Sequence, residues 1–206
     1  KARDSGSVAF EIINPRDFCY DQHHKVDDTP FGGHPGMLIK AEPVALAIEK
    51  SKPKGTHAVV ITEPSGKPFT QRVAKELASF ETVTFVCGHY EGIDHRVEET
   101  FATHVLSIGD YVLTNGELPA LVMTDAIVRL QPGVLGNQNS LEEESFENDL
   151  LAAPNYTRPE VWRGKPIPEV LKSGNHKKID QWRAEEALKR TEANRPDLLT
   201  KKNMSQ

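Results

Sequence analysis

Apolar residues gather into three short runs, and segments of helical periodicity lie between and after them. The runs at 56–62 (THAVVIT), 82–88 (TVTFVCG) and 103–109 (THVLSIG) have the length and β-branched content of buried strands. Between the first two, residues 70–80 (TQRVAKELASF) carry apolar positions at helical spacing. Strands that alternate with helices predict an α/β domain with a mainly parallel sheet.

A longer helix follows the third run, over residues 117–131 (ELPALVMTDAIVRLQ). Pro119 falls in its first turn, where a missing N–H needs no partner, and Gly133 is expected to close it. Its apolar positions predict a single stripe along one face. The residues of that stripe are Leu118, Leu121, Val122, Ile127 and Leu130.

The two ends of the chain differ from this central part. Residues 8–18 (VAFEIINPRDF) predict a strand, and the Gly/Pro-rich loop 30–36 precedes a short apolar run and a helix. Residues 136–144 are acidic and lack periodicity, which predicts a flexible linker. We therefore expect an α/β domain at 1–135, and a small all-helical domain at 145–206 whose long helix is capped by Asn175.

Charge is distributed unevenly along the chain, although the net charge is −5. Residues 1–135 hold 13 Lys and Arg against 18 Asp and Glu, whereas residues 154–206 hold 12 against 7. The basic carboxyl-terminal part also carries aromatic residues, a combination that suits contact with phosphate and bases. No run approaches the roughly 18 apolar residues of a membrane span, and no secretory leader is recognisable, which predicts a soluble, cytoplasmic protein.

Neither cysteine predicts a metal or redox motif. Cys19 and Cys87 lack the spacing of metal ligands, and Cys87 sits in an apolar run where a free thiol usually fills the core. We assign no metal ligands, and a role for magnesium stays open. A reducing compartment agrees with this cysteine usage.

Each of the three predicted strands ends in a polar loop that contains glycine: TEPSG, CGHYEG and SIGDYVLTNG. Because ligands gather at the carboxyl ends of parallel strands, we expect these loops to surround one pocket. Glycine leaves main-chain groups uncovered, which suits a flat heteroaromatic ring such as adenine, sandwiched by Ile108, Leu113 and Pro64. Neither GxGxxG nor GxxxxGK[ST] occurs, which argues against the usual modes of dinucleotide and triphosphate binding.

Several longer motifs together resemble one family. The segments VDDTPFGGHPGM, FVCGHYEGIDHRV, SIGDYVLTNGELPA, PGVLG, NYTRPEVWRG and VLKSGNHKKIDQWR are similar, in order and nearly end to end, to bacterial tRNA (guanine-N1)-methyltransferases that modify guanosine 37, the TrmD family of the SPOUT superfamily. The resemblance implies a deep trefoil knot and a homodimer whose active sites are shared between subunits. Relatives begin with a further strand before the segment that matches Lys1, which leads us to expect trimming or disorder at this end.

The resemblance also implies S-adenosylmethionine as methyl donor, held by the three loops. Glu63 and Asn115 depart from the residues usual in the family. The implied cofactor-binding residues are Ile61, Thr62, Glu63, Pro64, Gly66, Gly88, Tyr90, Glu91, Ser107, Ile108, Gly109, Asp110, Tyr111, Val112, Leu113, Gly116 and Pro119.

Two catalytic residues are implied in the same way. Glu144 stands at the position of the family's general base, which is usually Asp, and would take the N1 proton of guanine. Arg129 matches an arginine that binds guanine O6. By residue type alone, Glu144 belongs to an acidic run of the kind that is usually solvated, and Arg129 suits the last turn of a helix.

The substrate implied by the resemblance is a tRNA with G at positions 36 and 37. The implied RNA-binding residues are Gly33, Met37, Arg158, His176 and Arg183. As single residues, these cations also fit an ordinary solvated surface, and His176 fits the start of a helix. Two other functions stay open: a tRNA-binding relative without catalysis, and a ribose 2'-O-methylase of the same superfamily.

Overall fold

The computed structural model describes residues 2–51, 55–135 and 144–203, and these form two compact units, Lys1–Gly136 and Asn137–Gln206. Most of the predicted linker, residues 136–143, lies outside the described residues. Among the described residues, no helix combines the length and apolar character needed to cross a bilayer.

A parallel sheet of three strands forms the centre of the first unit. The strands are β3 (His57–Pro68), β4 (Thr82–Cys87) and β5 (His104–Ser107), in the order β4-β3-β5. Pairing is parallel on both sides of β3, with His57 opposite Thr82 and Val60 opposite His104. The three predicted strands and the parallel sheet are thereby confirmed. β3 nevertheless runs past its predicted end at Thr62, so the predicted loop TEPSG lies within this strand, at an irregularity in its pairing with β5 between Thr62 and Lys67.

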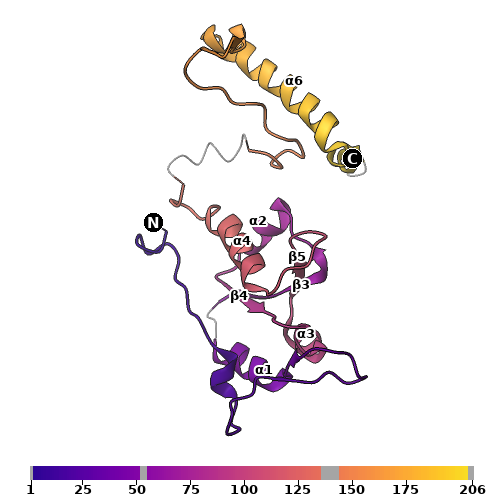
Figure 1. Ribbon diagram of the computed structural model, residues 1–206. Helices are drawn as coiled ribbons and strands as arrows, with labels where there is room; N and C mark the ends of the chain where they lie inside the picture. Colours follow the sequence, from indigo (N-terminus) through magenta and orange to yellow (C-terminus); the bar gives the residue numbers. More distant parts are fainter. Residues whose placement is uncertain (1, 52–54, 136–143, 204–206) are drawn as a thin grey trace. The chain divides into compact units, whose positions relative to one another are not determined.

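Helices cover both faces of this sheet (Figure 1). α1 (Ala41–Lys50) and α3 (His95–Phe101) pack on one side, and α2 (Gln71–Ala78) and α4 (Glu117–Val128) on the other. Because β3 is buried on both faces, alternate residues enter different clusters: Val59 and Ile61 pack toward α1 and α3, and Ala58 and Val60 toward α2 and α4. The continuous apolar run of β3 follows from this double burial.

The predicted stripe on α4 is wrong in its composition. The face of α4 toward the core consists of Ala120, Met123 and Ile127. Leu118, Leu121 and Val122 are instead 56%, 64% and 51% exposed. The helix is apolar on more than one side, so the periodicity by itself does not identify the face that packs on the sheet. α4 also ends earlier than predicted, with Arg129 as its C-cap rather than running on to Gly133.

The predicted strand at 8–18 is also wrong. Residues 8–14 have no regular structure, and a 3₁₀ helix η1 (Pro15–Phe18) follows, capped by Asn14. Phe10 and Ile12 are exposed, and no strand among the described residues pairs with this segment. An extended apolar segment forms a strand only when a neighbour satisfies its backbone groups, which accounts for the difference. Beyond it, β1 (Asp27–Asp28) and β2 (Leu38–Ile39) pair antiparallel and close the loop between them.

The second unit is built around α6 (His176–Asn194) and α7 (Pro196–Asn203). Asn175 caps α6, as predicted, by accepting a hydrogen bond from the Lys178 amide. A 3₁₀ turn, η2 (Glu169–Lys172), precedes α6. The prediction of an all-helical unit omitted a two-stranded hairpin, β6 (Val161–Trp162) and β7 (Lys165–Pro166).

Candidate functional site

The irregular part of β3 after Thr62 and the loops that follow β4 and β5 meet at one edge of the sheet. Gly116, the N-cap of α4, donates from its amide to Gly88 O just beyond β4, at 2.8 Å. Gly116 O in turn accepts from Thr62 Oγ1 at 3.1 Å. An isolated bridge between His89 and Asn115 adds a further link between these loops. The convergence predicted from the sequence is therefore present.

Close backbone approach explains why glycine stands at two of these positions. A Cβ at Gly116 would overlap Thr62 Oγ1 and come within 2.8 Å of the Gly88 amide nitrogen. A Cβ at Gly66 would lie 2.6 Å from the Leu106 amide nitrogen, because the segment after Thr62 runs directly over β5. No larger side chain fits at either position without moving backbone.

These loops enclose a cavity of about 210 Å³. Its lining combines residues at the strand ends with residues of the loop that leads into α4. Pro64, Ile108 and Leu113, the three residues expected to sandwich a flat ring, all line it. The full set of lining residues is Thr62, Glu63, Pro64, Gly88, His89, Tyr90, Glu91, Gly92, Leu106, Ser107, Ile108, Gly109, Tyr111, Val112, Leu113, Thr114, Asn115, Gly116 and Pro119.

The cavity includes every expected cofactor-binding residue except three. Ile61 is 4% exposed and belongs to the core, Gly66 packs on β5, and Asp110 is exposed. The structure adds lining residues that the motifs did not mark: His89, Gly92, Leu106, Thr114 and Asn115. All five are immediate sequence neighbours of expected residues, so taking whole loops rather than selected positions would have found them.

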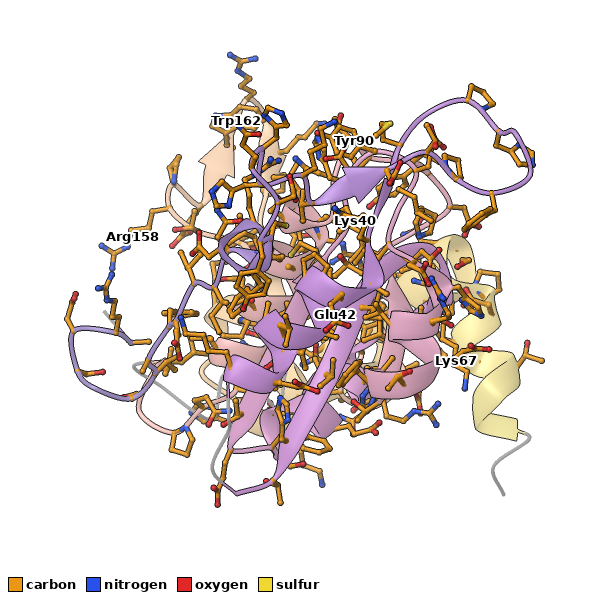
Figure 2. The ribbon with its side chains drawn as sticks, turned by 90° about the horizontal axis from the view of Figure 1, so that it is seen from below. Lys40, Glu42, Lys67, Tyr90, Arg158 and Trp162 are labelled. Atoms are coloured by element: carbon orange, nitrogen blue, oxygen red, sulfur yellow. The ribbon has the colours of Figure 1, made fainter. Side chains whose placement is uncertain are left out.

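The second loop also joins the cavity to the amino-terminal Gly/Pro loop. The Glu91 amide donates to Met37 O at 3.0 Å, and the Ile39 amide donates to Gly92 O at 3.0 Å. Gly36 has φ +102°, and a Cβ there would lie 2.6 Å from Glu91 Cγ. Tyr90 is held at φ +58° with its ring against His89, at a centroid separation of 4.3 Å, and it is labelled in Figure 2. The loop that bears Gly33 and Met37 is thus anchored beside the cavity.

Two titratable groups near the cavity are perturbed by their surroundings. Burial raises the pKa of Glu63, and the neighbouring Glu98 carboxyl raises it further. Burial also raises the pKa of the Cys87 thiol to about 11, with a smaller contribution from Glu117. Glu98 is in turn 3.5 Å from His95 Nδ1 on α3. The cavity wall therefore includes the Glu63 carboxyl group, which ionises at a higher pH than an ordinary glutamate.

The two expected catalytic residues belong to different units. Arg129 is the half-buried C-cap of α4, with its amide bonded to Asp125 O at 3.1 Å, so a favourable interaction with the helix dipole is also available to it. Glu144 is half-buried at the start of the described part of the second unit, where its carbonyl accepts from the Glu147 amide at 3.4 Å. Neither unit by itself contains both residues.

The remaining expected RNA-binding residues lie on the second unit. Arg158 is exposed in the segment before the hairpin. His176 is the first residue of α6, directly after its N-cap, and Arg183 lies two turns further along the helix. Among the described residues, no cluster of His, Cys, Asp and Glu has an arrangement that could hold a metal ion.

Comparisons of this chain with family models and with known proteins point to the same family. The model of the family tRNA (Guanine-1)-methyltransferase TrmD matches residues 1–201. A tRNA (guanine-N(1)-)-methyltransferase of Dehalococcoides mccartyi is 52% identical over all of this chain and 84% of the relative's length. Proteins of the same name from Staphylococcus carnosus and Moorella thermoacetica are 51% and 49% identical, over 98% and 100% of this chain and 82% and 83% of their own lengths. The chain accordingly belongs to the tRNA (guanine-1)-methyltransferase family.

Proposed function

We propose that this protein transfers a methyl group from S-adenosylmethionine to N1 of guanosine 37 in tRNA, beside the anticodon. The observation that carries the proposal is the cavity at the ends of β3, β4 and β5, with glycine at positions where no other residue fits. Family membership supplies the reaction class, since its relatives are named for methylation of guanine N1 in tRNA.

The chemistry of the cavity suits this methyl donor. Apolar side chains stand on the wall beside uncovered main-chain groups, a combination that binds an adenine ring by stacking and by backbone hydrogen bonds. Glu63 and Glu91 place carboxyl groups in the same lining, which favours a ligand that carries positive charge. S-adenosylmethionine supplies an electrophilic methyl group on a positively charged sulfur. Residues of the three loops hold it, and no metal is needed to activate the methyl group.

The difficult step for the protein is the removal of a proton. Guanine N1 carries a proton at neutral pH, so its lone pair becomes available only when a base accepts that proton. Glu144 is the proposed base. Arg129 donates hydrogen bonds to guanine O6, where negative charge grows as the proton departs, and so stabilises the transition state more than the ground state.

On the family resemblance, we propose that two subunits share the site, with Arg129 from the first unit of one subunit and Glu144 from the second unit of the other. An apolar surface suited to dimerisation is present on α4, where Leu118, Leu121 and Val122 are each more than half exposed. We propose that this face packs against its copy in a two-fold dimer, and that Glu144 of the partner subunit completes each site. A trefoil knot through the β3–β5 crossing is proposed on the same family basis and is supported by the close passage of Gly66 over Leu106.

On the RNA side, the basic second unit positions the anticodon arm while the base is read at the cavity. Arg158, His176 and Arg183 are its proposed phosphate ligands. Gly33 and Met37 flank the site from the amino-terminal loop, which hydrogen bonds hold beside Glu91. The G36–G37 context belongs to this proposal.

The decisive experiment is methyl transfer from labelled S-adenosylmethionine to a tRNA transcript with G36 and G37, followed by mapping of the modified position. We expect 1-methylguanosine at position 37. Glu144→Gln should abolish turnover while leaving donor and tRNA affinity unchanged, whereas Glu144→Asp, which keeps the carboxylate, should retain activity. Binding of tRNA without any methyl transfer would identify a non-catalytic relative, and a 2'-O-methylribose product would identify a ribose methylase; either result refutes the proposal.

A further inference from the structure

The β6–β7 hairpin of the second unit presents an aromatic ring together with positively charged side chains. Val161 pairs with Pro166 and Trp162 with Lys165, and the two turn residues Arg163 and Gly164 have φ of +49° and +75°. Positive φ at both central positions is the geometry of a tight two-residue hairpin turn. The ring is thereby held on a short, well-defined element rather than on an irregular loop.

Trp162 is unusually exposed for a side chain of its size. It is 58% exposed even though the Arg163 guanidinium lies over the ring, 4.9 Å from its centroid. The Trp162 side chain is labelled in Figure 2. Burial of an indole ring contributes strongly to folding, so a ring left this open makes little contribution to the stability of the unit. Its position suits a contact made with another molecule.

The charges around Trp162 indicate the chemistry of that molecule. Residues 158–166 carry Arg158, Arg163 and Lys165 against one acid, Glu160, whose carboxylate lies 3.5 Å from Lys172 Nζ. Within the part of the chain that the structure describes, no carboxylate forms an ion pair with any of those three cations. Since side chains paired across a ladder share a face of the hairpin, Lys165 stands beside Trp162.

We propose that the β6–β7 hairpin binds an unpaired nucleotide of the tRNA, with its base stacked on Trp162 and the adjoining phosphates on Arg163 and Lys165. An aromatic ring flanked by cations complements an unstacked base and its phosphates, and loops of RNA are where such bases occur. A buried protein partner is a poorer fit, because the charges of Arg158, Arg163 and Lys165 would have to be desolvated with it. The inference rests on the proposed tRNA substrate and adds a contact remote from the methyl-transfer chemistry.

The test compares variants of the full chain by tRNA affinity over a series of salt concentrations. Trp162→Ala should weaken binding by about 5-fold to 100-fold, the range for loss of one stacked base, with an unchanged slope of log affinity against log salt. Arg163→Ala should weaken binding and reduce the slope by about 0.7–0.9, because one phosphate contact is lost. Trp162→Phe keeps a stacking ring and should recover most of the affinity.

The matched control is Val161→Ala, since Val161 is equally exposed, at 58%, and adjacent residues of a strand point to opposite faces. Its tRNA affinity should stay at the wild-type value. Equal weakening by Val161→Ala and Trp162→Ala would overturn the proposal in favour of an apolar protein interface, and affinity unchanged in Trp162→Ala would overturn it outright.

A fluorescence measurement keeps the proposal testable if Trp162→Ala does not fold. Binding of tRNA should quench the wild-type tryptophan emission, and this quenching should be absent in Trp162→Phe, which retains Trp182. Full quenching in Trp162→Phe would contradict stacking on Trp162. Methyl transfer is measured separately. A wild-type protein that binds tRNA through Trp162 but yields no 1-methylguanosine would refute the proposed function and leave the hairpin contact standing. A Trp162→Ala protein with wild-type tRNA affinity and normal turnover would refute only the hairpin contact.

Discussion

Gly116 is the position where the packing of the cavity can be tested most directly. It links two loops, because its amide donates to Gly88 O and its carbonyl accepts from Thr62 Oγ1. Its φ of −84° is one that alanine adopts freely, so Gly116→Ala introduces a collision without backbone strain. The added Cβ would overlap Thr62 Oγ1 and lie 2.8 Å from the Gly88 nitrogen and 2.9 Å from Cys87 Cα.

Two of these three neighbours are backbone atoms, so the collision cannot be relieved by a change of rotamer. Overpacking of this kind costs about 1–3 kcal/mol, to which the poor N-capping of alanine adds. At about 2–4 °C per kcal/mol for a chain of this size, we expect the melting temperature to fall by roughly 2–12 °C. The affinity for S-adenosylmethionine should fall by about tenfold or more, because the loops that line the cavity are forced apart.

Calorimetric melting and titration calorimetry with the methyl donor measure these two effects. Gly133→Ala is the control: Gly133 has φ +76° and open space around it, so alanine there adds backbone strain of roughly 1–2 kcal/mol without touching the cavity. It should lower the melting temperature and leave donor affinity unchanged. Thr62→Ala combined with Gly116→Ala should recover only part of the stability, since the backbone contacts persist. A Gly116→Ala protein with unchanged melting temperature and donor affinity would refute the described packing of the loops.

Three further predictions follow from single residues. The pKa of Glu63 is raised in the folded state, so its ionisation disfavours folding and the wild type should lose stability as pH rises above 4.5. The Glu63→Gln protein lacks this titration and should become more stable than the wild type over the same pH range. Melting curves with no pH-dependent difference between the two proteins would contradict this. Cys87 is partly buried and has a pKa of about 11, so it should react slowly with a thiol reagent at pH 8 in the native protein and rapidly after denaturation. An absorbance assay follows both reactions. Fast labelling of Cys87 in the native protein would contradict the prediction. Arg129→Lys keeps positive charge at the end of α4 and should preserve stability. It should lower kcat by about 10²- to 10³-fold with donor affinity unchanged, because a lysine ammonium does not reproduce the paired hydrogen bonds of a guanidinium group. A kcat equal to that of the wild type would remove Arg129 from the proposed mechanism.

Local patterns in the sequence predicted those elements whose stability depends on near neighbours. The apolar run at 56–62 becomes β3 because both faces of a central parallel strand are buried, and Asn175 caps α6 because an Asn side chain satisfies a free amide at a helix start. The glycine-bearing loops likewise predicted the cavity, since parallel strands bring their carboxyl ends to one edge of the sheet.

Other features depended on which partner each segment meets. Residues 8–14 have a strand-like composition but no strand to pair with, and α4 has apolar residues on more sides than the sheet can cover. The exposure of Trp162 could not be predicted from the sequence either, because a tryptophan in a basic segment packs inward or outward according to the neighbours that the hairpin provides.

The sequence by itself thus determined the alternation of strands and helices, the helix cap and the positions where backbone is left uncovered, because these follow from side-chain shape and periodicity over a few residues. Tertiary structure alone decided that Gly116 lies against Thr62 and Gly88, that Gly36 makes room for Glu91, and that Leu118, Leu121 and Val122 stay exposed on α4. These contacts join residues far apart along the chain, and their distances are set by how layers pack against each other, which no local pattern encodes.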